Sequence, residues 1–164
     1  MTLTSKRLTY SKFGKDDFED YYDLVSKDEV MRYTTGKAYT LEKANARFQK
    51  LLAMNAEFEE IGVFAVRISA TDEYIGVAKI TFIKDGEAEI GYSFLPKFWG
   101  FGYGTEAATR MVELAKSTPY VKRLMAIVDP KHKASIRILT KHNLSLSEVG
   151  TYEGLPAHFY RLEL

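Results

Sequence analysis

The sequence has no cysteine among its 164 residues. Disulfide bridges, cysteine metal ligands and a cysteine nucleophile are therefore all excluded. An acyl-transfer enzyme built from this chain cannot use a cysteine acyl-enzyme, so direct attack by the acceptor on the acyl donor becomes the simpler route. No set of histidines and carboxylates has the spacing of metal ligands either, and we expect no metal.

An excess of one charge is also missing, since 23 basic residues stand against 22 acidic ones. A net charge of +1 gives no reason to expect nucleic acid as a partner. No apolar run is long enough to cross a membrane, and the N-terminal residues lack the apolar core of a signal peptide. The composition thus predicts a single domain over residues 1–164, in the cytoplasm and without membrane contact.

What the chain does have is glycine at alternate positions before an amphipathic helix. Gly100, Gly102 and Gly104 follow an expected strand, and Thr105 and Glu106 are expected to open the helix. Apolar residues then recur at helical spacing, at Ala108, Met111, Val112 and Ala115. A glycine turn that leads into a helix start presents free backbone N–H groups and the positive end of the helix dipole. The stretch therefore predicts a phosphate or pyrophosphate site rather than a tight turn alone.

Three kinds of phosphate site use this arrangement. The P-loop needs Gly-Lys followed by Ser or Thr, which the chain lacks. A dinucleotide fingerprint fits the spacing of Gly102, Gly104 and Ala107, but most of the chain precedes it, and too few residues follow to complete a doubly wound sheet.

The third kind fits the surrounding sequence better. Trp99-Gly-Phe-Gly-Tyr-Gly-Thr-Glu-Ala107, preceded by Ala88-Glu-Ile-Gly-Tyr-Ser-Phe-Leu-Pro96, resembles the central motif of the GCN5-related N-acetyltransferases (GNAT), nearest to the RimJ/RimL-type branch. A second segment, from Asp129 to Leu139, resembles the family's D-P-x-N-x-x-S segment, with His132 in place of the usual Asn. Asn143-Leu144 stands where Gly-Phe is common in the family.

Hydrophobic periodicity gives an element order that agrees with this resemblance. Alternation and β-branched content predict strands, and apolar residues at helical spacing predict helices. Thr40 is a predicted helix N-cap, and Asp85-Gly86 predicts a tight turn between two strands. The strands are expected at 7–13, 62–69, 74–83, 87–95, 123–129, 144–151 and 157–164, and the helices at 16–27, 40–58, 105–115 and 130–142, with a short turn or helical piece at 30–36. Strands 87–95 and 123–129 should be parallel because a helix joins them. The expected fold is a three-layer α/β/α domain around a mixed, mostly antiparallel sheet.

The resemblance implies a coenzyme site. In the family the glycine turn binds the pyrophosphate of acetyl-coenzyme A, and the pantetheine arm enters a gap between strands 87–95 and 123–129. No resident metal cofactor is implied. The residues expected at the coenzyme are Phe94, Leu95, Trp99, Gly100, Phe101, Gly102, Tyr103, Gly104, Thr105, His132 and Ser135.

Two residues are candidates for the chemistry. Glu89 lies in a strand expected to be covered on both faces, where a partly buried carboxylate with a raised pKa could accept a proton through water. A salt-bridged or exposed Glu is the equal alternative. Ser135 matches the family's serine near the thioester sulfur, where it would hydrogen-bond the thiolate. Capping of the helix is its alternative.

In the resembled family the first helices form one wall of the acceptor site. Tyr33 and Tyr39, in the loop between these helices, are therefore candidates to contact the acceptor, although each aromatic alone more often fills a core. Lys133, Arg137 and Lys141 form a basic stripe that is either solvated or in contact with coenzyme phosphates.

The predicted function is transfer of an acetyl group to a primary amine, on a protein N-terminus or a small molecule, by a monomer or homodimer. A non-catalytic acyl-CoA-binding module and a dinucleotide-binding oxidoreductase are the alternatives.

Overall fold

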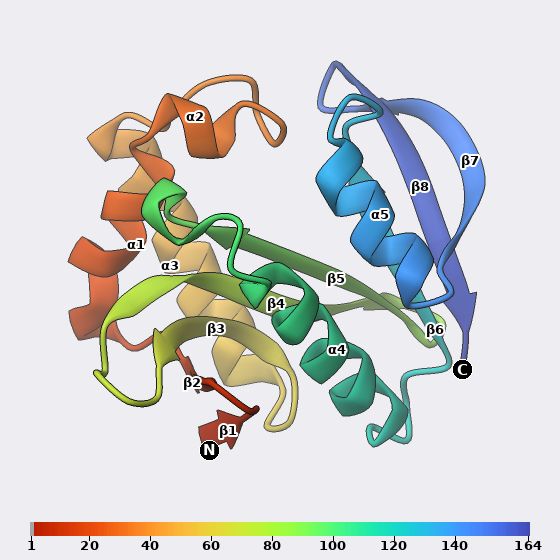
Figure 1. Cartoon of the computed structure of the whole chain (residues 1–164), viewed down its shortest axis with the longest axis horizontal. Helices are drawn as coiled ribbons and strands as arrows, with labels where there is room; N and C mark the ends of the chain where they lie inside the picture. Colours follow the sequence, from red (N-terminus) through yellow and green to blue (C-terminus); the bar gives the residue numbers. More distant parts are fainter. Residues whose placement is uncertain (1) are drawn as a thin grey trace.

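The computed structural model describes residues 2–164 and shows an eight-stranded sheet with helices on both faces (Figure 1). The strands are β1 Thr2–Thr4, β2 Leu8–Lys12, β3 Gly62–Ile68, β4 Tyr74–Lys84, β5 Glu87–Phe94, β6 Arg123–Val128, β7 Ser145–Tyr152 and β8 Leu155–Glu163. The helices are α1 Phe18–Val25, α2 Asp28–Met31, α3 Leu41–Glu57, α4 Tyr103–Lys116 and α5 Lys133–Lys141. Short 3-10 turns lie at Lys15–Asp17 and Pro96–Phe98.

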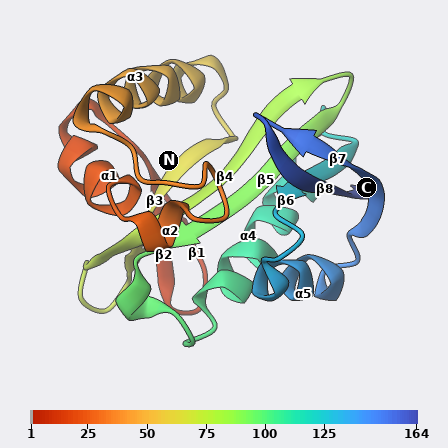
Figure 2. The ribbon, with the colours of Figure 1, turned by 90° about the horizontal axis from the view of Figure 1, so that it is seen from above.

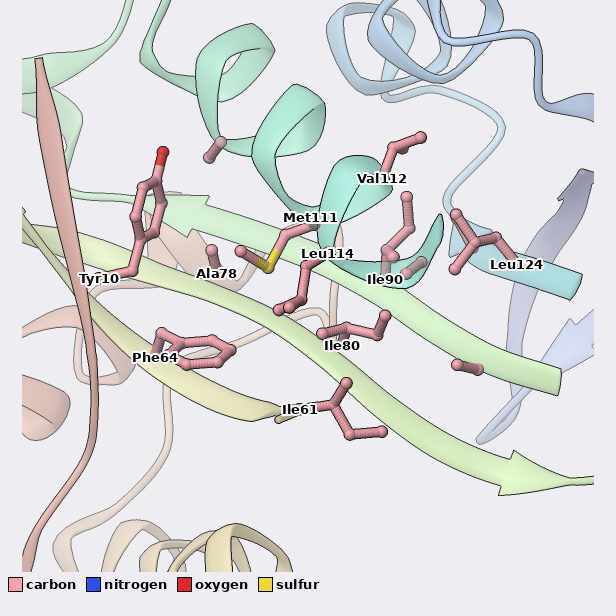
Figure 3. Packing of buried hydrophobic residues seen from close by; sticks show 14 of the residues in the cluster. Tyr10, Ile61, Phe64, Ala78, Ile80, Ile90, Met111, Val112, Leu114 and Leu124 are labelled. Atoms are coloured by element: carbon pink, nitrogen blue, oxygen red, sulfur yellow. The ribbon is translucent and has the colours of Figure 1, made fainter. Parts of the chain in front are cut away.

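The three layers are seen from above in Figure 2. Helices α1 and α3 lie on one side of the sheet, whereas α4 and α5 lie on the other. Each side has its own hydrophobic core. Figure 3 shows part of the core beneath α4, where Met111 and Leu114 meet Phe64 and Ile80 of the sheet. The opposite core is aromatic, with the Phe13 ring edge-on to Phe48 at 6.1 Å. The expected α/β/α fold is confirmed.

The strand order across the sheet is β1-β2-β3-β4-β5-β6-β8-β7. Among the described strands only β5 and β6 pair in parallel, joined by the crossover through α4. That pairing is short, because only Glu87–Glu89 of β5 faces Arg123–Met125 of β6. Farther along, β5 stays paired with β4 as far as Phe94, and β6 stays paired with β8 as far as Val128. The two strands therefore separate, and their last residues have no strand between them.

Local sequence signals predicted several elements correctly. Asp85 and Gly86 form the expected tight turn, with φ of 50° and 79°. Thr40 caps α3, since its hydroxyl oxygen accepts a hydrogen bond from the Lys43 N–H at 3.2 Å. Helix α3 extends from this cap along one face of the sheet and supplies part of a cavity wall described below.

Other boundaries differ from the sequence prediction. The three-residue strand β1 was not expected, because so short a segment carries too little alternation to be recognised. Helix α4 begins at Tyr103 rather than Thr105, because left-handed Gly102 serves as its N-cap. Helix α5 begins only at Lys133, after a turn in which the Asp129 carboxylate accepts the Lys131 N–H at 2.8 Å. Phe58 lies beyond α3 in an extended conformation.

Candidate functional site

The glycine turn has the backbone conformation that a phosphate site requires. Gly100 and Gly102 have φ of 84° and 82°, values that residues other than glycine rarely adopt. The Glu106 N–H donates to the Gly102 carbonyl at 3.1 Å, the first hydrogen bond of α4. The N–H groups of the three residues between them therefore have no carbonyl partner within the helix. The third glycine serves packing, because a Cβ on Gly104 would lie 3.1 Å from Ile138 Cδ1 of α5.

A cavity of about 710 Å³ opens at this turn, within the size range of ligand sites. It is bounded by the starts of α4 and α5, by the separated ends of β5 and β6, and by the loop after α2. The predicted coenzyme residues that line it are Phe94, Trp99, Gly100, Gly102, Tyr103, Gly104, Thr105, His132 and Ser135. The structure thus brings nine of the eleven predicted coenzyme residues to one cavity, although they come from two separate segments of the sequence.

Two predicted coenzyme residues are not among those lining the cavity. Leu95 is buried in the core on the α1–α3 side, and its N–H donates to the Ile75 carbonyl at 2.9 Å. The Phe101 side chain is 60% exposed, so that only its backbone belongs to the glycine turn. Trp99 does line the cavity, and its indole N–H donates to the Phe94 carbonyl at 2.7 Å. That hydrogen bond fixes the end of β5 against the turn.

Basic side chains border the same cavity at the start of α5. Lys131, Lys133 and Arg137 line it and are exposed, whereas Lys141, the last residue of the predicted basic stripe, does not line it. Two residues of the predicted stripe are thus in position to meet an anionic ligand held at the glycine turn.

A pair of hydroxyl groups lies inside the cavity. The Tyr92 and Ser135 side-chain oxygens are 3.2 Å apart, with either able to donate. Burial raises the pKa of Tyr92 to about 12, although the hydrogen bond from Ser135 partly opposes this effect. The phenol therefore stays protonated near neutral pH and can donate. Sequence reasoning did not select Tyr92, although strand alternation places it on the same face as Ile90 and Phe94, toward α4.

An aromatic stack spans the cavity wall. The Tyr33 ring, from the loop after α2, stacks on His132 with ring centroids 4.4 Å apart and planes 13° from parallel. Burial lowers the pKa of His132 below its ordinary value of 6.5, and the Asp129 carboxylate partly opposes the shift. The imidazole is therefore neutral at physiological pH. The residue in the usual place of Asn is held in a defined position by an aromatic partner.

A second cavity, of about 240 Å³, contains Glu89. The Glu89 carboxylate receives a hydrogen bond from the Lys79 ammonium at 2.9 Å, and the two side chains are 21% and 33% exposed. Gly91 leaves room for this lysine, because a Cβ there would lie 2.8 Å from Lys79 Cε. Glu89 is thus salt-bridged, as one of the two alternatives from the sequence held, and it also lines a cavity, while its role as a proton acceptor stays a prediction.

Tyr39 also lines this smaller cavity, together with Arg47 of α3 and Glu153 of the β7–β8 turn. Burial raises the pKa of Tyr39, so its hydroxyl stays protonated. The Arg47 guanidinium and the Glu153 carboxylate are 3.5 Å apart, which joins two walls of the cavity.

The two cavities adjoin. Both are lined by Tyr33 and Thr34 of the loop after α2 and by residues 127–129 at the end of β6. Glu89 faces the α1–α3 side of the sheet, whereas Tyr92 and Ser135 lie on the α4–α5 side. Ligands could therefore approach from opposite faces of the sheet and meet where β5 and β6 separate.

Within residues 2–164, no cluster of three or more His, Asp or Glu side chains could hold a metal ion. The helices of that range are all too short or too polar to be candidate membrane spans.

Comparison with known proteins gives the class to which this fold and site belong. Residues 7–144 match the family described as the acetyltransferase (GNAT) domain. The chain therefore belongs to the GNAT family and is an acetyltransferase, as the central motif predicted. The dinucleotide-binding alternative was wrong, since a doubly wound sheet would be mostly parallel, whereas this one has a single parallel pair among its described strands.

Particular relatives agree with this assignment. The chain is 30% identical over 142 residues to the uncharacterized N-acetyltransferase YnaD of Bacillus subtilis, covering 86% of this chain and 81% of that protein. Among solved structures, the ribosomal L7/L12 α-N-protein acetyltransferase RimL in complex with coenzyme A has a TM-score of 0.82 at 15% identity, covering 100% and 98% of the two chains. Spermidine N-acetyltransferase from Vibrio cholerae, with coenzyme A and spermine, has a TM-score of 0.80 at 14% identity, covering 97% and 96%. These likenesses show a common fold that includes the RimL branch.

Proposed function

We propose that the chain transfers the acetyl group of acetyl-CoA directly to a primary amine, with both substrates bound at once. The observation that carries this proposal is the meeting of two cavities where β5 separates from β6. The larger would hold acetyl-CoA, and the smaller would hold the amine. A direct transfer suits a chain without cysteine, and holding both reactants in place supplies much of the rate.

The larger cavity offers groups for each part of the coenzyme. The free N–H groups at the start of α4 suit the pyrophosphate, and Lys133 and Arg137 suit further phosphate charge. The residues of β5 beyond Glu89 have β4 on one side and no strand on the other. Their backbone groups on that open side are available to hydrogen-bond the amides of the pantetheine arm, much as an added strand would.

The chemistry needs a proton acceptor and a group that stabilises the leaving sulfur. Glu89 would take the proton of the incoming ammonium through water, so that the free amine nitrogen attacks the thioester carbonyl carbon. The C–S bond then breaks as the C–N bond is made, and the electron pair leaves on the thiolate. Ser135, hydrogen-bonded to Tyr92, would donate a hydrogen bond to that sulfur. The nitrogen loses a second proton as the amide forms, and this proton passes to the thiolate to give free coenzyme A, while the proton held by Glu89 is released to solvent.

The smaller cavity favours a small amine as the acceptor. Its volume is about 240 Å³, and Arg47 and Glu153, which are 3.5 Å apart, join two of its walls. Its lining carries both charge signs, with Lys79 and Arg47 against Glu89, Asp129 and Glu153. A small molecule that carries an amine and an anionic group fits this balance better than a polyamine, which would favour a purely acidic wall. A protein N-terminus, as the name of RimL implies for that protein, is the alternative acceptor.

The test is an acceptor screen by release of free thiol from acetyl-CoA, over amino acids, polyamines and peptides with free N-termini. Glu89→Gln should lower kcat about 10²- to 10⁴-fold with little change in acetyl-CoA affinity, the usual range for loss of a general base. Ser135→Ala should lower kcat less, since a hydroxyl acts only as a hydrogen-bond donor there.

Glu87→Gln is the matched control, because Glu87 lies two residues earlier on β5 and is likewise ion-paired, with Arg161 at 3.0 Å, yet lines neither cavity. Normal kcat in Glu89→Gln would remove Glu89 from the mechanism. Acetyl-CoA binding without transfer to any amine would favour the non-catalytic acyl-CoA-binding alternative.

A further inference from the structure

Arg7, from the turn between β1 and β2, contacts the glycine turn across more than ninety positions of sequence. Its guanidinium donates to the Phe101 carbonyl at 2.8 Å through Nη1 and to Glu106 Oε2 at 2.8 Å through Nε. Its backbone N–H donates to Glu106 Oε1 at 2.7 Å. The guanidinium carbon also lies 4.5 Å from the centre of the Tyr103 ring. One residue thus holds both the turn and the first turn of α4, and we name these contacts the Arg7 clamp.

The carboxylate in the Arg7 clamp is well shielded. The Glu106 side chain is only 13% exposed, and the Ser5 hydroxyl donates to it as well. Burial alone would raise the pKa of Glu106, but the hydrogen bonds from Ser5 and Arg7 outweigh burial and hold that pKa below its usual range. Glu106 is therefore an ionised carboxylate that accepts hydrogen bonds from three donors, two of them from Arg7. Such charge-assisted hydrogen bonds are stronger than an exposed ion pair.

The glycine turn has particular need of such a clamp. Gly100 and Gly102 both adopt left-handed φ, and glycine loses more conformational freedom on ordering than any other residue. If the turn were ordered only when the ligand bound, the cost of ordering it would weaken the binding of that ligand. The charge of Glu106 also lies in the first helical turn, where it would repel a phosphate unless a cation balanced it. The Arg7 guanidinium supplies that cation next to the turn, with Nη2 3.5 Å from where a Cβ on Gly102 would lie.

We propose that the Arg7 clamp is a positioning device for acetyl-CoA: it holds the glycine turn in its ligand-binding conformation and cancels the charge of Glu106. The inference rests on the proposed function, since it assumes that the glycine turn binds the coenzyme pyrophosphate. It makes the strand pair β1–β2, which lines neither cavity, part of the coenzyme site. Arg7 is then a positioning residue that acts through the backbone of residues 100–106.

The test compares Arg7→Ala with Arg110→Ala. Arg110 of α4 also ties the N-terminal strands to this helix, because its Nε donates to the Thr4 carbonyl at 3.0 Å. Its other partner is Glu113, and within residues 2–164 it makes no hydrogen bond or ion pair with the glycine turn. Each variant is titrated with acetyl-CoA by calorimetry, its melting temperature is measured, and kcat is measured at saturating acetyl-CoA. S-acetylpantetheine, which lacks the pyrophosphate and nucleotide, serves as a second acetyl donor.

Arg7→Ala should raise the Kd for acetyl-CoA at least about tenfold, the equivalent of one lost charge-assisted hydrogen bond. Its kcat at saturation and its kcat/KM for S-acetylpantetheine should stay close to wild type, since the clamp does not touch the reacting groups. Arg7→Lys keeps the charge without the planar fork and should fall between wild type and Arg7→Ala. Arg110→Ala should lower the melting temperature without changing the Kd.

An unchanged Kd in folded Arg7→Ala or Arg7→Lys would overturn the proposal. Equal losses with acetyl-CoA and S-acetylpantetheine, or an equal rise in Kd in Arg110→Ala, would also overturn it, because the effect would then be general destabilisation. Wild-type protein that binds no acetyl-CoA would overturn the proposed function itself, a result distinct from a normal wild type with unaffected variants.

Discussion

The catalytic candidate Glu89 must be held in place and must also keep an oxygen free to accept a proton. Its ion pair with Lys79 at 2.9 Å holds the carboxylate in place within the smaller cavity, which a proton acceptor needs. The ion pair uses Oε1 of Glu89, which leaves the second carboxylate oxygen to meet a water or an ammonium group. Lys79 therefore acts to orient the candidate base. The ion pair with Lys79 is thus compatible with a catalytic role as well as with a structural one.

His132 gives a prediction at the scale of one residue. Burial beneath Tyr33 disfavours the charged imidazole, so its pKa, followed by NMR titration, should lie below 6.5. Because the unfolded chain would then bind a proton at higher pH than the folded chain, the contribution of His132 to stability is present above pH 6.5 and is lost as the pH falls below it. Tyr33→Ala should expose the ring and return the pKa toward 6.5.

Tyr39→Ala is the control for this titration, since Tyr39 lines only the smaller cavity, whereas His132 lines only the larger one. A pKa at or above 6.5 in the wild type, or one that Tyr33→Ala leaves unmoved, would contradict the stacked and desolvated state of His132.

The sequence reveals a site residue when that residue stands in a local motif, and not when its role depends on a partner distant along the chain. Gly102 and Ser135 stand in local motifs, so the resemblance located them directly. Lys79, Tyr92 and Arg7 have no motif of their own. Each acts through a partner that is close in space and distant along the chain, such as Ser135 for Tyr92 and Glu106 for Arg7. Strand alternation could have placed Tyr92 on the correct face, but no local pattern pairs Arg7 with α4.

At the scale of elements, the separation of β5 and β6 creates the site. Parallel strands cannot be joined by a tight turn, so α4 must cross between them, and its N-terminus is brought to the end of β5. The glycine turn thus lies where the strands have separated, beside the cavity. The parallel pairing was predictable from the helical crossover. Its termination after only three residue pairs was not, because that depends on contacts of the whole sheet.

Helix α3 carries a prediction about its cap. Thr40→Ala removes the hydroxyl that accepts the Lys43 N–H and should lower the free energy of unfolding by about 1 kcal/mol. In a chain of this size the melting temperature should fall by roughly 2–4 °C, measured by calorimetry. Thr40→Ser keeps the cap oxygen and should stay near wild type. Equal stability of Thr40→Ala and wild type would show that the cap hydrogen bond contributes nothing in solution.

Element boundaries show where sequence reasoning is weakest. The cap of α3 and the Asp85–Gly86 turn were found because their residue types have one dominant local use. The start of α4 was placed two residues late, because left-handed Gly102 acts as its N-cap in place of a polar side chain. Strand β1 was missed because only its pairing with β2 identifies it.

In the molecule as a whole, the helices on the two faces of the sheet border different cavities. Helices α4 and α5 border the larger cavity, α3 borders the smaller one, and the loop after α2 borders both. Strands β5 and β6 separate between the two cavities, and under the proposed function the thioester and the amine would meet there. Topology and family were predictable from sequence. The charge of the smaller cavity depends on side chains from six helices and strands and was not predictable.

The most direct test of this account is calorimetric titration of the wild type and of Gly102→Val with acetyl-CoA, coenzyme A and NADH. Gly154→Val is the matched control, because Gly154 has a similar φ of 81° with open space around it and does not line the larger cavity. Both substitutions force a side chain into left-handed backbone, which costs at least about 1–2 kcal/mol of stability.

We predict that the wild type and Gly154→Val bind acetyl-CoA and coenzyme A, that Gly102→Val loses most of this affinity while remaining folded, and that NADH does not bind. Acetyl-CoA binding that persists unchanged in folded Gly102→Val, or a wild type that binds neither form of the coenzyme, would contradict the assignment of the glycine turn as the coenzyme phosphate site.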